Sequence, residues 1–141
     1  MAHTILIVDD SPPMRSVIRK TIKASGYGDS RFFEAGNGAE ALQILRQNWL
    51  DLVVTDYNMP SMNGMELIAA MKKDEVLQAV PVLVITTEGS SRMVDEFLAG
   101  GAAGYLKKPF TPEEIRTKII AVLGESHDEE DAGDGAEGCD F

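Results

Sequence analysis

The 141-residue chain has one cysteine, one tryptophan and little positive charge. Cys139 has no second cysteine with which to form a disulfide inside the chain, so we interpret it as a surface thiol. No apolar run approaches the roughly 18 residues that a membrane span needs. The first residues, MAHTILIVDD, lack the basic region of a secretory signal. We therefore expect a cytoplasmic protein that makes no membrane contact.

The acidic residues are unevenly distributed along the chain, whose formal net charge is −10. Residues 125–141 hold eight acids and no Lys or Arg, whereas residues 1–124 hold 15 acids and 13 bases. Neither part contains a basic stretch, so a nucleic-acid partner is not expected. The composition predicts one folded domain over residues 1–124 and a disordered acidic tail over residues 125–141.

Short apolar runs alternate with amphipathic helical segments through the first 124 residues. This alternation is typical of an α/β fold with a parallel sheet. The first run is almost entirely apolar, as in a central strand that is buried on both faces. We predict a five-stranded parallel sheet with five helices on both faces. The expected strands are Thr4–Val8, Arg31–Ala35, Asp51–Thr55, Val80–Ile85 and Gly104–Lys107.

Capping residues mark the expected ends of the helices. Ser11, followed by two prolines, is expected to begin the first helix, and Gly26 to end it. Asn63 and Thr111 each precede a glutamate at the spacing of a capping box. Trp49 continues the helical spacing of the second helix, so we expect it in the core.

Chemically reactive side chains stand where the predicted strands end. Because the carboxyl ends of parallel strands meet at one edge of a sheet, these side chains should gather in one pocket. Clustered acids raise one another's pKa unless a cation joins them. Mg²⁺ suits that position, since it takes oxygen ligands and keeps waters that a phosphate can replace. The residues concerned are Asp9, Asp10, Asp56, Thr86 and Lys108.

Asp56 is the candidate nucleophile, because a carboxylate that attacks phosphorus forms an acyl phosphate. Considered alone, Asp56 could equally cap a turn after its strand, but the other strand-end residues favour the chemical role. We expect Asp10 to bind the metal directly and Asp9 to bind it through water. Neither acid is needed as a helix cap, since Ser11 already takes that position.

Lys108 is the candidate for balancing the acids and for contacting a phosphoryl oxygen. Lys107 points to the opposite side of an extended chain, so only one of the two lysines can reach the pocket. Thr86 offers a hydroxyl donor to the phosphoryl group, and Thr87 beside it is the alternative.

Four segments stand in the order ILIVDDS, VVTDYNMPSMNGMEL, PVLVITTE and GAAGYLKKPF. Together they resemble the receiver domain of two-component response regulators, and most of all the stand-alone chemotaxis type, the CheY-like regulators. The resemblance covers residues 4–123. It implies a flavodoxin-like receiver fold with strand order 2-1-3-4-5, and a signalling domain rather than an enzyme for external substrates.

The resemblance also implies a role for each residue of the pocket. Asp56 would accept a phosphoryl group from a histidine kinase, and Lys108 would contact that group. The bond between Lys108 and Pro109 would be cis. The implied Mg²⁺ ligands are Asp9, Asp10, Asp56 and the backbone carbonyl of Asn58.

A conformational switch is implied as well. Thr86 would move to bond the phosphoryl group, and Tyr105 would then turn inward and change the face formed by the fourth helix, the fifth strand and the fifth helix. Asn58 and Glu88 would tune the rate of hydrolysis. The implied partners are a kinase and a target such as the flagellar motor switch or a phosphatase, and a monomer is expected.

Other functions give different expectations. A phosphorelay intermediate or phosphate sink would pass its phosphoryl group to another histidine, with slow hydrolysis and fast back-transfer. A phosphatase that forms an aspartyl phosphate is expected to have a DxD motif, in which the second acid serves as general acid and base. Here Asn58, not an acid, stands two residues after Asp56. A flavin-binding module is disfavoured, because no phosphate-cradling Ser/Thr/Gly loop follows the first strand.

Overall fold

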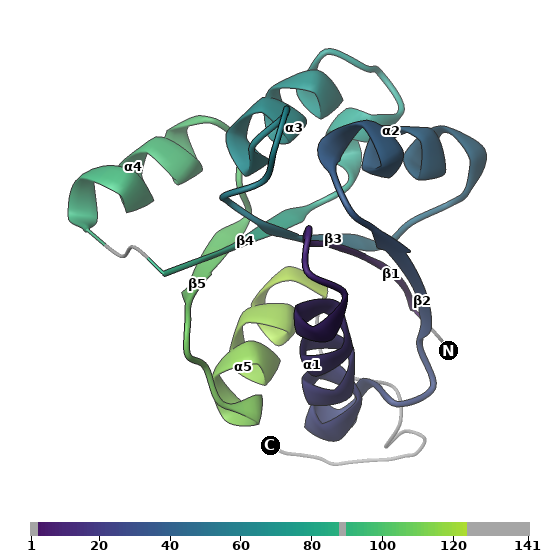
Figure 1. Cartoon of the computed structure of the whole chain (residues 1–141), viewed down its shortest axis with the longest axis vertical. Helices are drawn as coiled ribbons and strands as arrows, with labels where there is room; N and C mark the ends of the chain where they lie inside the picture. Colours follow the sequence, from purple (N-terminus) through teal and green to yellow (C-terminus); the bar gives the residue numbers. More distant parts are fainter. Residues whose placement is uncertain (1–2, 88–89, 124–141) are drawn as a thin grey trace.

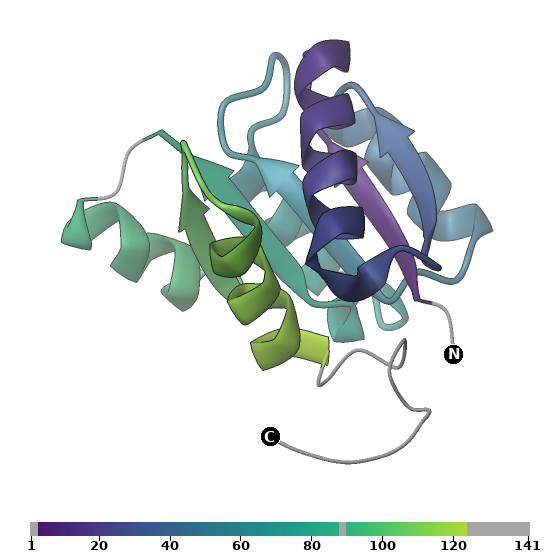
Figure 2. The same cartoon turned by 90° about the horizontal axis from the view of Figure 1, so that it is seen from below.

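The five apolar runs form one parallel sheet, in the strand order β2-β1-β3-β4-β5 (Figures 1 and 2). This computed structural model describes residues 3–87 and 90–123. It confirms the predicted fold class and strand order. The strands are β1 Thr4–Val8, β2 Arg31–Ala35, β3 Leu52–Asp56, β4 Val82–Thr86 and β5 Gly104–Lys107.

Helices cover both faces of the sheet. Figure 1 shows α1 and α5 on one face and α2, α3 and α4 on the other. In the described part of the chain, no helix is long and apolar enough to cross a membrane. The helices are α1 Pro12–Ile22, α2 Gly38–Gln47, α3 Gly64–Lys72, α4 Ser91–Ala99 and α5 Pro112–Leu123, with a π-helical turn η1 at Lys23–Tyr27 and a 3₁₀ turn η2 at Leu77–Ala79.

Each face of the sheet has its own apolar core, because successive strand residues point to opposite faces. In β1, Leu6 and Val8 belong to the core beneath α2, α3 and α4. Ile5 and Ile7 belong to the core beneath α1 and α5. A strand that is covered on both faces needs apolar residues at every position, which explains the apolar sequence of β1.

The caps predicted at the starts of three helices, Ser11, Asn63 and Thr111, are confirmed. The Ser11 hydroxyl accepts a hydrogen bond from the backbone amide three residues later, at 3.3 Å. Asn63 and Glu66 form a capping box at the start of α3, with both hydrogen bonds at 2.8 Å. Thr111 and Glu114 form another before α5, at 2.8 and 3.1 Å. These residues start the helices that lead away from the carboxyl edge of the sheet.

Two strands end later than the sequence predicted. β3 extends to Asp56 and β4 to Thr86, so these residues end their strands instead of following them. The reason is that the parallel pairing continues to these positions, with Asp56 opposite Ile85 and Thr86 opposite Lys107. Both side chains are therefore fixed by the sheet and not by a loop.

The first helix ends earlier than expected. The α-helical part stops at Ile22, and the chain continues through η1, in which Gly26 has a φ of 106°. Glycine adopts this conformation at no steric cost. Gly26 thus lies at a bend in η1 and not at the end of α1.

The prediction that Trp49 is a core residue is wrong, because its side chain is 81% exposed. α2 ends at Gln47, and Asn48 has an extended backbone with φ −140° and ψ 154°. The helical spacing therefore does not continue to Trp49. The next residue, Leu50, is 5% exposed and packs in the core.

Candidate functional site

The carboxyl edge of the sheet brings acidic and basic side chains together as predicted. Asp9 follows β1, Asp56 ends β3 and Lys108 follows β5. The Lys108 Nζ lies 3.3 Å from Oδ1 of Asp56 and 3.6 Å from Oδ2 of Asp9. Both acids are buried, at 1% exposure for Asp9 and 8% for Asp56. The lysine therefore bridges two buried carboxylates from different strands.

Asp10 completes a cluster with these two acids. One carboxylate oxygen from each of Asp9, Asp10 and Asp56 lies within 4.8 Å of the others. Two oxygen ligands of one Mg²⁺, each at about 2.1 Å, can be at most about 4.2 Å apart. The three oxygens therefore lie close to the spacing that one ion requires.

Asp9 carries the clearest sign that a cation belongs here. Its Oδ1 accepts a hydrogen bond from the Ser11 amide at 2.9 Å. Its Oδ2 is buried and accepts no hydrogen bond, and the Lys108 ammonium at 3.6 Å is too distant to donate one. A buried carboxylate oxygen without a donor is costly. A hard cation that accepts oxygen ligands would remove that cost, so the residues present fit Mg²⁺.

The electrostatics of Asp56 indicate the same need. Burial raises the pKa of Asp56 above its ordinary value, the Lys108 ammonium lowers it, and the Asp9 carboxylate raises it. The net shift of the pKa is upward, so one lysine does not compensate for burial and for the neighbouring acid. The pocket therefore holds less positive charge, one ammonium, than its three acids need.

The loop between β3 and α3, which carries the exposed Asn58, is held against the end of β3. The Gly64 amide donates to the Tyr57 carbonyl, and the Tyr57 amide donates to the Ile85 carbonyl, both at 2.9 Å. A Cβ at position 64 would lie 3.0 Å from the backbone oxygen of Asp56 and 3.2 Å from Cα of Tyr57. A Cβ here would force the backbone of Asp56 and Tyr57 to shift, and glycine avoids that shift at the close approach of α3 to the nucleophile.

The two lysines at the end of β5, Lys107 within the strand and Lys108 after it, differ as the alternation predicted. Lys107 is exposed, whereas the side chain of Lys108 is 17% exposed and lies in the pocket. The Lys108 amide donates to the Thr86 carbonyl at 2.8 Å, which ties it to the end of β4. The bond between Lys108 and Pro109 is cis, as the resemblance implied.

Thr86 is completely buried at the end of β4, and Thr87 is exposed. This difference in burial favours Thr86 as the hydroxyl that serves the pocket. Tyr105 is half-buried in β5 beside Val84, and the ammonium of Lys118 lies 5.0 Å from the centre of its ring. Glu88, which the resemblance implied as a hydrolysis-tuning residue, lies outside the described residues.

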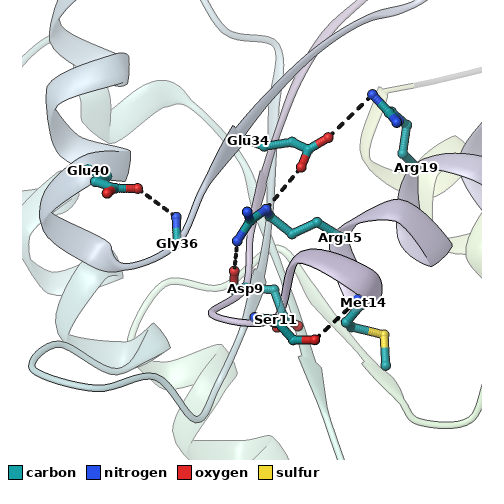
Figure 3. Close-up of polar contacts among 8 residues, drawn as sticks. All are labelled: Asp9, Ser11, Met14, Arg15, Arg19, Glu34, Gly36 and Glu40. Atoms are coloured by element: carbon teal, nitrogen blue, oxygen red, sulfur yellow. Dashed lines mark hydrogen bonds and ion pairs between the residues drawn. The ribbon is translucent and has the colours of Figure 1, made fainter.

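Arg15 is a residue of the site that sequence reasoning missed. Its guanidinium donates from Nη1 to the backbone carbonyl of Asp9 and from Nε to Glu34, the latter at 2.9 Å (Figure 3). Glu34 lies on β2, 19 residues away in sequence. No pattern of neighbouring residues in the sequence predicts a contact of this kind. Only the pairing of β1 with β2 brings the two residues together.

Comparisons with known proteins agree with this geometry. The family model "Response regulator receiver domain" matches residues 5–120. The chain is 40% identical over 121 residues to "Chemotaxis protein CheY1" of Helicobacter pylori, which covers 85% of this chain and 96% of that protein. It is 38% identical over 119 residues to "Chemotaxis protein CheY-3" of Vibrio cholerae, over 84% of this chain and 90% of that protein.

Solved structures give the same result. The chemotaxis response regulator CheY4 of Vibrio cholerae matches with a TM-score of 0.79 and 32% sequence identity, over 87% of this chain and 100% of that one. The family model spans most of the chain, and its match includes the acids, the threonine and the lysine of the pocket. The chain belongs to the response regulator receiver domain family.

Proposed function

We propose that the chain is a phosphorylation-dependent signalling switch, in which Asp56 accepts a phosphoryl group from a histidine kinase. The observation that carries this proposal is the pocket itself. A buried carboxylate ends β3, with the Lys108 ammonium at 3.3 Å and two further carboxylates close by. Residues 1–124 form the receiver domain in this proposal, and the acidic residues 125–141 follow it.

The residues of the pocket have separate roles in the transfer. A carboxylate oxygen of Asp56 attacks the phosphorus, and the bond from phosphorus to the donor imidazole breaks with its electrons on nitrogen. Lys108 already lies beside Oδ1 of Asp56, so its ammonium can hold a phosphoryl oxygen. The Thr86 hydroxyl donates a hydrogen bond to a second oxygen of the phosphoryl group. Fixed donors of this kind stabilise charge that develops in the transition state.

Mg²⁺ is the cofactor that the donor set supports. Its ligands are the carboxylates of Asp10 and Asp56, the backbone carbonyl of Asn58, and Asp9 through water. When bound, the ion neutralises phosphoryl oxygens and so favours attack by a carboxylate. Oδ2 of Asp9 accepts no hydrogen bond and has only the Lys108 ammonium at 3.6 Å, and the pKa of Asp56 is raised; both observations support a cation at this position.

The output of the switch is assigned to the face formed by α4, β5 and α5. Thr86 ends β4, the strand that pairs with β5. A movement of Thr86 toward the phosphoryl group therefore reaches Tyr105 through one strand pairing. Tyr105 is only half-buried and can turn inward. Asn58 and Glu88 are proposed to set how quickly the phosphoryl group hydrolyses.

The partner is proposed to belong to chemotaxis, either the flagellar motor switch or a phosphatase. The relatives at 38–40% identity are chemotaxis proteins, which supports this assignment. They do not favour the alternative of a phosphorelay intermediate or phosphate sink. Such a protein would keep its phosphoryl group until a second histidine receives it.

The proposal is tested by the intact mass of the chain after incubation with acetyl phosphate and Mg²⁺. The wild-type chain should gain one phosphoryl mass, and Asp56→Asn or addition of EDTA should abolish the gain. Absence of any gain in the wild-type chain would contradict the proposed chemistry. Rapid decay of the modified species supports a switch, whereas a stable species that transfers its group to a histidine phosphotransfer protein supports the relay.

A further inference from the structure

We infer that Arg15 is a positioning residue for this chemistry, because it fixes the turn between β1 and α1 that carries Asp9 and Asp10. The inference rests on the proposed function, in which these acids hold Mg²⁺. Arg15 contacts no carboxylate of the pocket in the interactions described. Its guanidinium acts on the backbone that carries the metal ligands.

The backbone of Asp9 is held from both sides. Its amide donates to the Ala35 carbonyl of β2 at 3.0 Å, and its carbonyl accepts from Nη1 of Arg15. Figure 3 shows the guanidinium between the Asp9 carbonyl and Glu34. The Arg15 side chain is 17% exposed, so water has limited access to replace it as a donor. The contact is therefore part of the packed structure of the turn.

Glu34 anchors the guanidinium. It accepts from Arg15 at 2.9 Å and pairs with Arg19, one helical turn further along α1, at 3.3 Å. The rigid fork of an arginine can serve the Asp9 carbonyl and Glu34 at the same time, whereas lysine has only one nitrogen. This network connects the edge strand β2 through α1 to the metal-binding turn.

Asp10 depends on the same turn. It lies between Asp9 and Ser11, whose amide donates to Oδ1 of Asp9 at 2.9 Å. The Arg15 amide also donates to the Ser11 carbonyl, at 3.0 Å. The residues on both sides of Asp10 are thus fixed, which orients its exposed carboxylate. Removing the guanidinium would loosen the turn without removing any of the carboxylates that the turn carries.

Two effects of Arg15 on metal binding have opposite signs. A positive charge close to three acids repels Mg²⁺, so by charge alone its removal would tighten binding. Positioning has the reverse consequence, because a looser turn costs binding free energy. Glu34 pairs directly with Arg15 and offsets its charge, so we expect positioning to dominate. The sign of the change in affinity therefore decides between the two.

The test is calorimetric titration of Mg²⁺ into the metal-stripped full-length chain. Arg15→Met and Arg15→Lys are each expected to weaken Mg²⁺ binding by about 10-fold, the lower end of what outer contacts of metal sites contribute. Arg19→Met is the matched control, because it removes a positive charge from the same helix and from the same Glu34. Its affinity should stay within about twofold of wild type.

A second readout needs no metal. Hydrogen exchange at the Ser11 amide should be faster in both Arg15 variants and unchanged in Arg19→Met, with EDTA present. Should Arg15→Met fail to fold, Arg15→Lys compared with Arg19→Lys carries the same test. If the Arg15 variants have the circular dichroism spectrum and the melting temperature of the wild type, their loss of Mg²⁺ affinity is local to the turn.

Unchanged or tighter Mg²⁺ binding by Arg15→Met overturns the positioning role and leaves the proposed function standing. Wild-type affinity in Arg15→Lys overturns the role assigned to the guanidinium fork, since a single nitrogen donor would then suffice to hold the turn. A wild-type chain that binds Mg²⁺ but gains no phosphoryl mass contradicts the proposed function alone. A wild-type chain that binds no Mg²⁺ overturns both.

Discussion

Asp56 is an ionisable residue whose surroundings oppose its charge. Burial and Asp9 together raise its pKa by more than Lys108 lowers it, so the folded chain holds the Asp56 proton more tightly than the unfolded chain does. Above the folded-state pKa, ionised Asp56 therefore destabilises the metal-free fold. Below the ordinary pKa of about 3.9 both states are protonated, and this destabilisation is absent.

Replacing Asp56 by Asn should consequently stabilise the chain when metal is absent. We expect the melting temperature in EDTA at pH 7 to rise by about 3 °C, and the difference to shrink as the pH falls toward 4. Added Mg²⁺ should raise the melting temperature of the wild type more than that of Asp56→Asn, because binding to the folded state stabilises it. Thermal unfolding followed by circular dichroism measures the melting temperature in EDTA, its dependence on pH and its rise with Mg²⁺.

Asp95→Asn is the control for this change, since Asp95 is an exposed acid on α4. It should leave the melting temperature unchanged at each pH. A lower melting temperature for Asp56→Asn at pH 7 would mean that the ion pair with Lys108, at 3.3 Å, outweighs burial and the repulsion by Asp9.

At the scale of the elements, what could be predicted from the sequence was what local chemistry decides. Ser11, Asn63 and Thr111 cap their helices through contacts within four residues, and each cap is confirmed. The apolar runs predicted the strands next to Asp56 and Thr86. They did not predict that these two residues are the last of their strands, because pairing with the neighbouring strands decides where a strand ends.

What could not be predicted depends on residues that are distant in sequence. Trp49 lies just beyond the end of α2, and a spacing argument has no means to detect that end. The contact of Arg15 with Glu34 exists because β1 pairs with β2, which places the beginning of α1 beside the edge strand. The acids of the site were evident in the sequence, but the residues that hold them were not.

The junction of β3 with α3 offers a test of how closely an element must approach the nucleophile. Gly64→Ala would place a Cβ 3.0 Å from the backbone oxygen of Asp56, and backbone cannot move as a flexible side chain does. We expect a loss of about 1–3 kcal/mol in the free energy of unfolding, as for overpacking in a core. Phosphorylation by acetyl phosphate should also slow, because the loop with Asn58 must shift.

Gly28→Ala is the matched control. Its added Cβ would meet only the Lys23 carbonyl at 3.7 Å, which is an ordinary contact, and its φ is −67°. We expect a change within about 0.5 kcal/mol in the free energy of unfolding, and a wild-type rate of phosphorylation. Urea titration gives the free energies. Equal effects of the two substitutions would show that the close approach at Gly64 does not constrain the site.

The whole molecule divides by charge into two unequal parts. Residues 1–124 are close to neutral, whereas the following 17 residues carry eight acids and no Lys or Arg. Both apolar cores are formed by described residues of the first part, up to Leu123. The predicted disorder of residues 125–141 falls outside the described residues. The proposed receiver domain should therefore be stable without the segment that carries most of the net charge.

Deleting residues 125–141 should leave the melting temperature within about 2 °C of the full chain, because every core residue among the described residues is retained. The phosphorylation rate with acetyl phosphate should also be unchanged at about 0.15 M salt, where charges more than about 8 Å apart are screened. A variant with its eight tail acids replaced by Asn and Gln separates charge from length. A lower melting temperature on deletion alone would mean that the tail packs on the domain. Faster phosphorylation in both variants would mean that its charge repels the anionic donor.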